Sequence, residues 1–96
     1  INLDPTVGSE IKKTRPCVII SSNISNKYLD NLVVLPLTST IKTYPSRVDC
    51  FFQEKYGQIA IDQIRTIDKK RLVKNIGKIN DTTSEKILEC LINYFK

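Results

Sequence analysis

The chain has 96 residues and a mass of 11.0 kDa, which suits one compact domain and is too short for two. It carries 15 Lys and Arg against 10 Asp and Glu, for a formal charge of +5, and it has no His, Met or Trp. Because no imidazole is present, Ser–His triads, histidine acid–base pairs and most zinc sites are excluded. Any catalysis must use arginine, lysine, hydroxyls, thiols or carboxylates, and we expect neither a metal nor a cofactor.

The cysteines and the termini bear on the compartment. The chain has three cysteines, an odd number, at Cys17, Cys50 and Cys90. They lie far apart and form no C-x-x-C pair, so their pattern is typical of neither a disulfide framework nor a metal knuckle. No stretch approaches the roughly 20 apolar residues of a membrane span, and the start lacks the pattern of a signal peptide. We therefore expect a cytoplasmic protein with reduced thiols. Position 1 is Ile, and we expect an initial strand to be missing before it.

Short runs of branched apolar residues recur along the chain and predict strands. They lie at 17–20, 32–35, 48–52 and 58–61. Polar stretches between them, such as 22–26 and 40–46, are rich in Asn, Ser and Pro and are typical of turns. This spacing favours an antiparallel β core.

The C-terminal segment has a different, helical pattern. Residues 82–85 read Thr-Thr-Ser-Glu, which has the form of a capping box at a helix start. The apolar residues that follow recur at helical spacing, at Ile87, Leu88, Leu91, Ile92 and Phe95. The pattern predicts an amphipathic helix packed on the sheet.

The positive charge is concentrated in one segment. Residues 65–78 hold six basic residues and one acid, so they account for the whole excess of +5. A basic stripe on a small domain is expected of a protein that binds a phosphate backbone. It is equally typical of a solvated face that keeps a protein soluble.

Three places along the chain carry candidate functional groups. Arg15 stands at the mouth of a predicted strand, where a guanidinium can clamp a phosphate or can simply be solvated. Thr38 and Ser39 follow another strand, where hydroxyls can donate to a phosphate oxygen or close a local turn. Asp62 and Gln63 interrupt an apolar run, either on its solvent face or as readers of a base edge.

Four blocks, in this order, closely resemble the MazF/PemK toxin family. They are NLDPTVGSE at 2–10, KTRP at 13–16, PLTS at 36–39, and DQIRTID at 62–68 followed by RL at 71–72. The resemblance covers nearly all of residues 1–96, which we interpret as one toxin domain. It implies a mainly β fold, a small SH3-like β-barrel of the CcdB/MazF type with a C-terminal α-helix.

The resemblance also implies an activity and its residues. Members of the family are metal-independent endoribonucleases of toxin–antitoxin modules, which cut single-stranded RNA by attack of a ribose 2′-OH. The family's catalytic arginine and hydroxyl fall on Arg15 and Thr38. The RNA-binding positions implied here are Glu10, Lys12, Ser39, Asp62, Gln63 and Arg65, with Tyr44 and Tyr56 as candidates for stacking on bases. Some relatives carry a further catalytic arginine where this chain has Ala60.

The resemblance also implies a homodimer that is inhibited by the acidic, disordered tail of a cognate antitoxin. The tail occupies the groove in which RNA lies near the subunit interface, and we expect residues 5–14 to form the loop that gates this groove. The physical chemistry is compatible, because fixed cationic and hydroxyl donors can stabilise a phosphorane and a positive surface attracts both RNA and an acidic tail. Two alternatives stay open. One is a toxin of the same fold that binds DNA gyrase and cuts nothing; the other is an SH3-like adaptor, which the low aromatic content of 7% disfavours.

Overall fold

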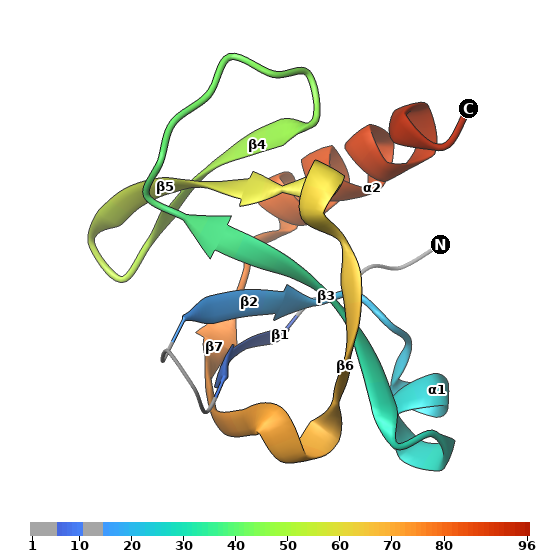
Figure 1. Cartoon of the computed structure of the whole chain (residues 1–96). Helices are drawn as coiled ribbons and strands as arrows, with labels where there is room; N and C mark the ends of the chain where they lie inside the picture. The colour runs from blue at the N-terminus through green and yellow to red at the C-terminus, as the bar shows by residue number, and fades with distance from the viewer. Residues whose placement is uncertain (1–5, 11–14) are drawn as a thin grey trace.

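A computed structural model of the chain describes residues 6–10 and 15–96. Its strands are β1 (Thr6–Glu10), β2 (Pro16–Ile19), β3 (Asn31–Thr38), β4 (Arg47–Phe52), β5 (Lys55–Ala60), β6 (Arg65–Asp68) and β7 (Leu72–Lys78). Its helices are α1 (Asn23–Tyr28), α2 (Asp81–Tyr94) and the two short 3-10 helices η1 (Ile61–Gln63) and η2 (Lys69–Arg71). The predicted antiparallel β core with a C-terminal helix is confirmed (Figure 1).

The strands form one antiparallel sheet in the order β4-β5-β3-β2-β1-β7, with β6 added beside β3. The pairing of β1 with β7 shifts register twice, between Val7 and Gly8 and between Ser9 and Glu10. Such irregularities increase the local twist and bend a strand. The sheet accordingly curls into a half-barrel, and α2 packs against it on the β4 and β5 side (Figure 1).

β3 is the central strand and changes partner along one of its edges. Its first half pairs with β6, so that Val34 lies opposite Arg65, and its end pairs with β5, so that Thr38 lies opposite Gln58. η1 connects β5 to β6 at the point where the partner changes. The opposite edge of β3 pairs with β2, with Cys17 opposite Pro36.

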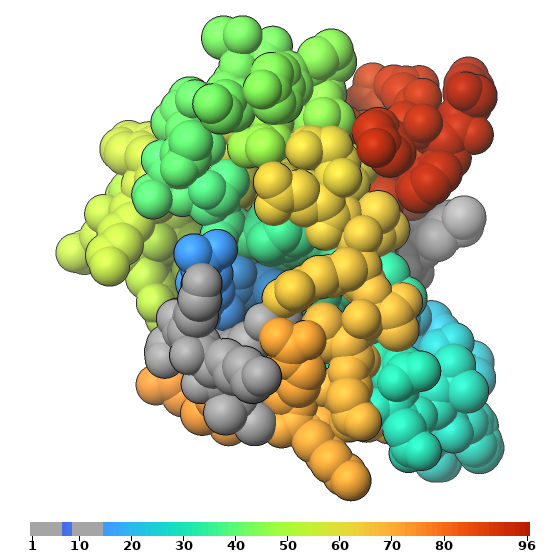
Figure 2. Space-filling view, viewed as in Figure 1, coloured from blue at the N-terminus to red at the C-terminus, as the bar shows by residue number. Residues whose placement is uncertain are grey.

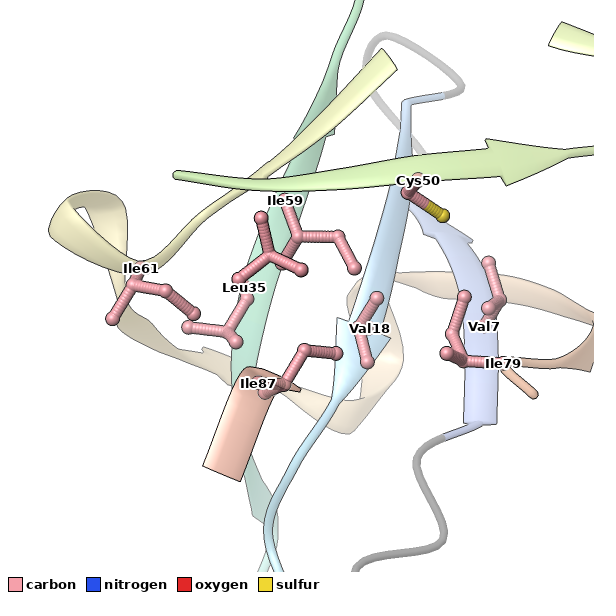
Figure 3. Close-up of a cluster of buried hydrophobic side chains, with 9 residues drawn as sticks. Val7, Val18, Leu35, Cys50, Ile59, Ile61, Ile79 and Ile87 are labelled. Atoms are coloured by element: carbon pink, nitrogen blue, oxygen red, sulfur yellow. The ribbon is translucent and has the colours of Figure 1, made fainter. Parts of the chain in front are cut away.

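The main core lies between the curled sheet and α2. Alternate side chains of the strands point into it, and Ile87 of α2 closes it (Figure 3). Its largest fully buried side chains are Val7, Val18, Leu35, Ile59, Ile61 and Ile87. A smaller cluster of Cys17, Leu32, Val34 and Ile67 lies on the other face of the sheet. The strand pattern read from the sequence therefore corresponds to true alternation between two buried faces.

Several boundaries differ from those expected. Residues 6–10 form β1 and do not belong to a loop, while residues 11–14 of the expected gate lie outside the described residues. The N-cap of α2 is Asn80, two residues before the predicted cap Thr82, because the Asn80 side chain accepts the hydrogen bond from the Thr83 amide. Residues 61–63 leave the strand and form η1, so the predicted strand at 58–61 ends one residue early.

The face of α2 was also only partly predicted. Ile87 is buried as expected, but Ile92 is 51% and Phe95 67% exposed. These two residues lie in the last turn and just beyond it, past the part of the sheet that the helix covers. The apolar spacing in the sequence therefore continues further than the packing does.

Candidate active site

Arg15 lies at a small hollow formed by three separate parts of the chain. The hollow has a volume of about 140 Å³ and is lined by Arg15, Pro16, Cys17, Pro36, Gln63 and Arg65. Figure 2 shows the start of β2, in blue, at the molecular surface. It lies between the surface of β3 and β5 on one side and the gold surface of residues 61–68 on the other. Two guanidinium groups and one amide therefore meet at one place, although they are separated by up to fifty positions in the sequence.

The strand registers explain why these residues meet. Cys17 of β2 pairs with Pro36 of β3, and on the other edge of β3 Val34 pairs with Arg65, which follows Gln63 by two residues. The hollow thus lies where the start of β2, the middle of β3 and the start of β6 come together. Pro36 has no N–H to donate to a ladder, which fits its position where β3 exchanges β6 for β5.

Charge, more than size, distinguishes this hollow. Its lining, within the residues that the structure describes, includes two arginines and no carboxylate. Its volume is well below the roughly 300–1,000 Å³ of pockets for drug-sized ligands. A planar guanidinium binds phosphate oxygens through paired N–H donors. The hollow suits a single phosphate group.

Thr38 lies two residues beyond Pro36 on β3. Arg15 lies two residues before Cys17, so the antiparallel pairing of Cys17 with Pro36 places Arg15 and Thr38 toward the same end of the two strands. The Thr38 hydroxyl oxygen accepts a hydrogen bond from the Thr40 amide at 3.1 Å. Because a hydroxyl keeps one donor when its oxygen accepts, the Thr38 O–H can donate to a ligand from a fixed rotamer. Ser39 follows in the exposed bend after β3.

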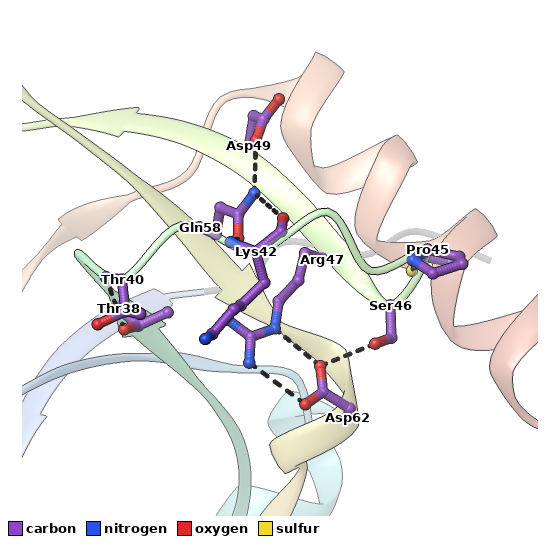
Figure 4. A network of polar contacts seen from close by, with 10 residues as sticks. Thr38, Thr40, Lys42, Pro45, Ser46, Arg47, Asp49, Gln58 and Asp62 are labelled. Atoms are coloured by element: carbon purple, nitrogen blue, oxygen red, sulfur yellow. Dashed lines mark hydrogen bonds and ion pairs between the residues drawn. The ribbon is translucent and has the colours of Figure 1, made fainter.

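Asp62 is held by an ion pair inside the molecule (Figure 4). Arg47 Nε lies 2.9 Å from Asp62 Oδ1, and Ser46 Oγ donates to the same oxygen at 2.9 Å. The Arg47 side chain is only 5% exposed and that of Asp62 is 25% exposed. The hydrogen bond from Arg47 lowers the pKa of Asp62, and the bond from Ser46 lowers it further. The carboxylate predicted to contact RNA therefore also anchors η1, whose next residue, Gln63, lines the hollow.

A second polar contact holds the segment after Thr38 against the sheet. Gln58 is buried, and its amide accepts from the Lys42 N–H and donates to the Lys42 carbonyl, both at 3.0 Å. The same amide donates to Asp49 Oδ1 at 3.0 Å. These bonds fix the course of the chain that leads away from the catalytic candidate (Figure 4).

The remaining residues predicted to bind RNA lie in different surroundings. Glu10 is the last residue of β1, where it pairs with Leu72, and Lys12 lies outside the described residues. Tyr44 lies beneath Arg47, with the guanidinium carbon 5.4 Å from the ring centre, and Tyr56 contacts the ring of Phe51. The sequence analysis missed Arg47, Ser46 and Phe51; their pairing with Asp62 and Tyr56 depends on strand register and has no local signal.

The basic segment 65–78 is divided among several surroundings. Arg65 lines the hollow, whereas the Lys69 ammonium donates to the Asn26 carbonyl of α1. Lys74 is exposed and pairs with Ser9, which on its other side pairs with Pro16. Strands lie about 4.8 Å apart, so Lys74 is roughly 10 Å from the start of β2. Arg65 and Lys74 therefore bring part of the basic segment to the hollow and its surroundings, whereas Lys69 contacts α1.

Two of the cysteines, away from the hollow, are poorly suited to act as nucleophiles. Burial raises the pKa of the Cys50 thiol, and burial together with the charges of Asp62 and Glu89 raises that of Cys90. Raised thiol pKa values disfavour the nucleophilic thiolate.

Within residues 6–10 and 15–96, no three His, Cys, Asp or Glu side chains are grouped to hold a metal ion. No helix in the described part of the chain is long and apolar enough to cross a membrane.

Comparison with known proteins places the chain in a family. Residues 1–95 match the model of the PemK-like, MazF-like toxins of type II toxin–antitoxin systems. The chain belongs to this family. The resemblance read from the four sequence blocks is therefore confirmed over the whole domain.

Individual relatives agree with this assignment. The chain is 33% identical over 96 residues to Endoribonuclease EndoA of Bacillus subtilis, an alignment that covers 94% of this chain and 83% of that protein. A mycobacterial endoribonuclease solved in complex with its cognate antitoxin has a TM-score of 0.86 and 26% identity, covering 99% of this chain and 95% of that one. The Mycobacterium tuberculosis toxin MazF-mt6 has a TM-score of 0.84 at 22% identity, with 95% of each chain covered. The predicted MazF-type toxin fold is confirmed.

Proposed function

We propose that this PemK/MazF-family chain is a sequence-specific endoribonuclease that cleaves single-stranded RNA without a metal. The observation that carries the proposal is the hollow in which Arg15, Gln63 and Arg65 converge beside Thr38. The described lining of the hollow holds two arginines and no carboxylate, which suits the binding of a phosphate. The exposed amide of Gln63 suits a hydrogen bond to a base edge. The similarity to an endoribonuclease at 33% identity supports the same activity.

The reaction we propose needs alignment and charge stabilisation more than covalent help. The ribose 2′-oxygen attacks the adjacent phosphorus, the bond to the 5′-oxygen breaks, and the products are a 2′,3′-cyclic phosphate and a 5′-hydroxyl. Arg15 would neutralise the phosphorane, and Thr38 would donate its O–H to a non-bridging oxygen. Donors fixed by a sheet pay little reorganisation cost when the charge develops, which is the main source of such catalysis.

Two proton transfers complete the reaction. The 2′-hydroxyl must lose a proton, and we propose three candidate acceptors: Glu10, the carboxylate of the family motif at the end of β1, a water molecule, or a phosphate oxygen. The 5′-oxygen must gain a proton. A guanidinium holds its protons tightly, so Arg15 is better suited to charge stabilisation than to proton donation, and water can supply the proton.

Base recognition is assigned to the residues around the hollow. Gln63 is exposed at its edge and offers both a donor and an acceptor to a Watson–Crick edge. We propose that Asp62, Ser39, Arg65 and Lys12 complete the RNA contacts. Asp62 would do so with the oxygen surface that Arg47 and Ser46 leave exposed, since a quarter of its side chain reaches solvent.

The partners follow from charge and exposed apolar surface. A net charge of +5 favours an acidic, disordered antitoxin segment, and a related endoribonuclease has been solved with its cognate antitoxin. A homodimer is also proposed. The exposed Ile92 and Phe95 at the end of α2 supply apolar surface that self-association would bury.

The test is cleavage of a mixed RNA pool by purified protein in the presence of a chelator, followed by analysis of the product ends. Arg15→Ala should reduce cleavage by more than a hundredfold and leave the far-UV spectrum and the melting temperature unchanged, because Arg15 is exposed. Lys86→Ala on the exposed face of α2 is the matched control and should keep full activity. Cleavage retained by Arg15→Ala would contradict the assignment. Absence of cleavage by the unmodified chain would favour the gyrase-binding alternative.

A further inference from the structure

We propose that Phe51 and Tyr56 form a platform on which an RNA base stacks, next to the phosphate held by Thr38. The inference rests on the proposed function, because it extends the RNA path from the Arg15 hollow onto the β4–β5 hairpin. Aromatic side chains bind unpaired bases in a sequence-tolerant way, since every base has a π-face.

The two rings form one exposed aromatic surface. Phe51 and Tyr56 are a directly opposed cross-strand pair, with ring centres 4.5 Å apart and planes inclined by 35°. Phe51 is 55% and Tyr56 82% exposed. The main core lies on the opposite face of these strands, where Val48, Cys50 and Ile59 are buried. The β4–β5 hairpin therefore packs on the core through its other face and leaves most of this aromatic surface in water.

The platform shares a sheet face with Thr38. Residues paired directly across antiparallel strands point to the same face, as do residues two apart on one strand. Thr38 pairs with Gln58, and Tyr56 lies two residues from Gln58 on β5. Tyr56 in turn pairs with Phe51. Thr38 and Tyr56 are thus diagonal neighbours, at roughly 7–8 Å between their α-carbons.

The backbone holds this arrangement firmly. β4 and β5 are joined through Gln53 and Glu54, which have φ of 51° and 62°, as in the tight two-residue turns that fix hairpin register. At Gly57, next to Tyr56, an added Cβ would lie 2.7 Å from the Thr38 carbonyl oxygen. Glycine therefore lets β5 approach β3 closely, and the platform keeps a constant position relative to Thr38.

A fluorescence titration tests stacking directly. The chain has no Trp, so Phe51→Trp introduces a single indole whose emission a stacked base quenches. The probe is a short 2′-O-methyl oligoribonucleotide of mixed sequence, which cannot be cleaved. We expect saturable quenching by this probe and none by an abasic oligonucleotide of the same length and charge. Equal quenching by both would overturn the proposal, because phosphate contacts alone would then explain the signal.

Binding measurements separate the platform from hairpin structure. Phe51→Leu combined with Tyr56→Leu should weaken binding of the 2′-O-methyl probe about tenfold, equivalent to about 1.4 kcal/mol. The pair Phe51→Tyr and Tyr56→Phe, which keeps both rings, should bind as the unmodified chain does. Tyr28→Leu, at a 76% exposed tyrosine on α1, is the matched control and should have no effect.

The outcomes also distinguish this inference from the proposed function. Cleavage of RNA by the unmodified chain without base-dependent quenching would contradict the platform alone. Base-dependent quenching without cleavage would keep the platform and contradict the nuclease. If the double leucine variant bound RNA normally but changed the mass measured by light scattering, the aromatic pair would be a protein interface and the proposal would be wrong.

Discussion

Two hollows of the surface differ in size and in charge. The larger, of about 700 Å³, lies between α2 and the start of β4, and its charged lining residues are Arg47, Asp49, Lys86 and Glu89. The smaller, of about 140 Å³, has Arg15 and Arg65 as its charged lining residues. Among the lining residues that the structure describes, the larger hollow combines both signs of charge, whereas the smaller one carries positive charge alone.

The difference shows that the volume of a hollow is a poor guide to its chemistry. In the larger hollow, Arg47 is almost buried and its charge is balanced by Asp62, so it stabilises the fold. In the smaller, Arg15 is exposed at the mouth of a rigid strand. An anion gains most where positive charge is concentrated and fixed, which favours the smaller hollow for a phosphate.

After Arg15→Ala, replacing the hydroxyl near the smaller hollow should have the largest effect. Thr38→Val keeps the shape of the side chain but removes its O–H, and we expect kcat to fall about a hundredfold, as when one donor to a developing oxyanion is lost. Thr38→Ser should restore most of the activity. Single-turnover cleavage of one defined RNA measures both, and an unchanged rate for Thr38→Val would place catalysis elsewhere.

Breaking the ion pair of the larger hollow should affect stability first. Asp62→Asn leaves the buried Arg47 charge without its counter-ion, and we expect a loss of about 2 kcal/mol, less than for a fully buried pair because Asp62 is partly exposed. The lowered pKa of Asp62 gives stability that is present above its unfolded pKa and is lost as the pH falls through its folded pKa.

Thermal unfolding at neutral and at acidic pH measures this contribution. The gap in melting temperature between the unmodified chain and Asp62→Asn should be about 10 °C at neutral pH and should shrink in acid. Combining Arg47→Met with Asp62→Leu leaves no unpaired charge and should recover most of the loss. A gap that grows in acid would contradict the role given to this pair.

Arg65 tests whether the second guanidinium of the smaller hollow holds RNA. Arg65→Ala should raise KM about tenfold, because a charge-assisted hydrogen bond contributes about 1.5–3 kcal/mol and part of this is exposed to solvent. Lys70→Ala, at an exposed lysine of η2, removes the same charge elsewhere and should change KM by less than about twofold. Equal effects of the two substitutions would mean that only net charge matters.

The smallest effect concerns the salt dependence of binding. Lys74→Gln should reduce the slope of log K against log salt by about 0.7, the value for one phosphate contact on a single strand. Lys69→Gln should leave the slope unchanged, since this ammonium contacts the Asn26 carbonyl. If both variants and the unmodified chain showed the same salt dependence, the basic segment 65–78 would be a solvated face that does not contact RNA.

The sequence predicted those features that depend on local pattern. Runs of branched apolar residues predicted β4 and the second half of β5, and the spacing of Ile87 with its apolar neighbours predicted α2. The ordered motif blocks predicted the family. Features set by long-range pairing were missed: the pairing of Arg47 with Asp62, the contact of Phe51 with Tyr56 and the division of the basic segment all follow from strand register. The helix start was misplaced because Asn80 competes as a cap with the Thr-x-x-Glu pattern.

The central claim is that the Arg15 hollow holds the phosphate of the RNA. The chain has only four arginines, so the Nε–Hε signals of Arg15, Arg47, Arg65 and Arg71 can be followed by NMR during titration with a 2′-O-methyl oligoribonucleotide. We predict that the signals of Arg15 and Arg65 shift and saturate together, and that both shift more than the signal of Arg47, which Asp62 holds away from the hollow. A saturable shift of Arg47 with Arg15 unmoved would contradict the account.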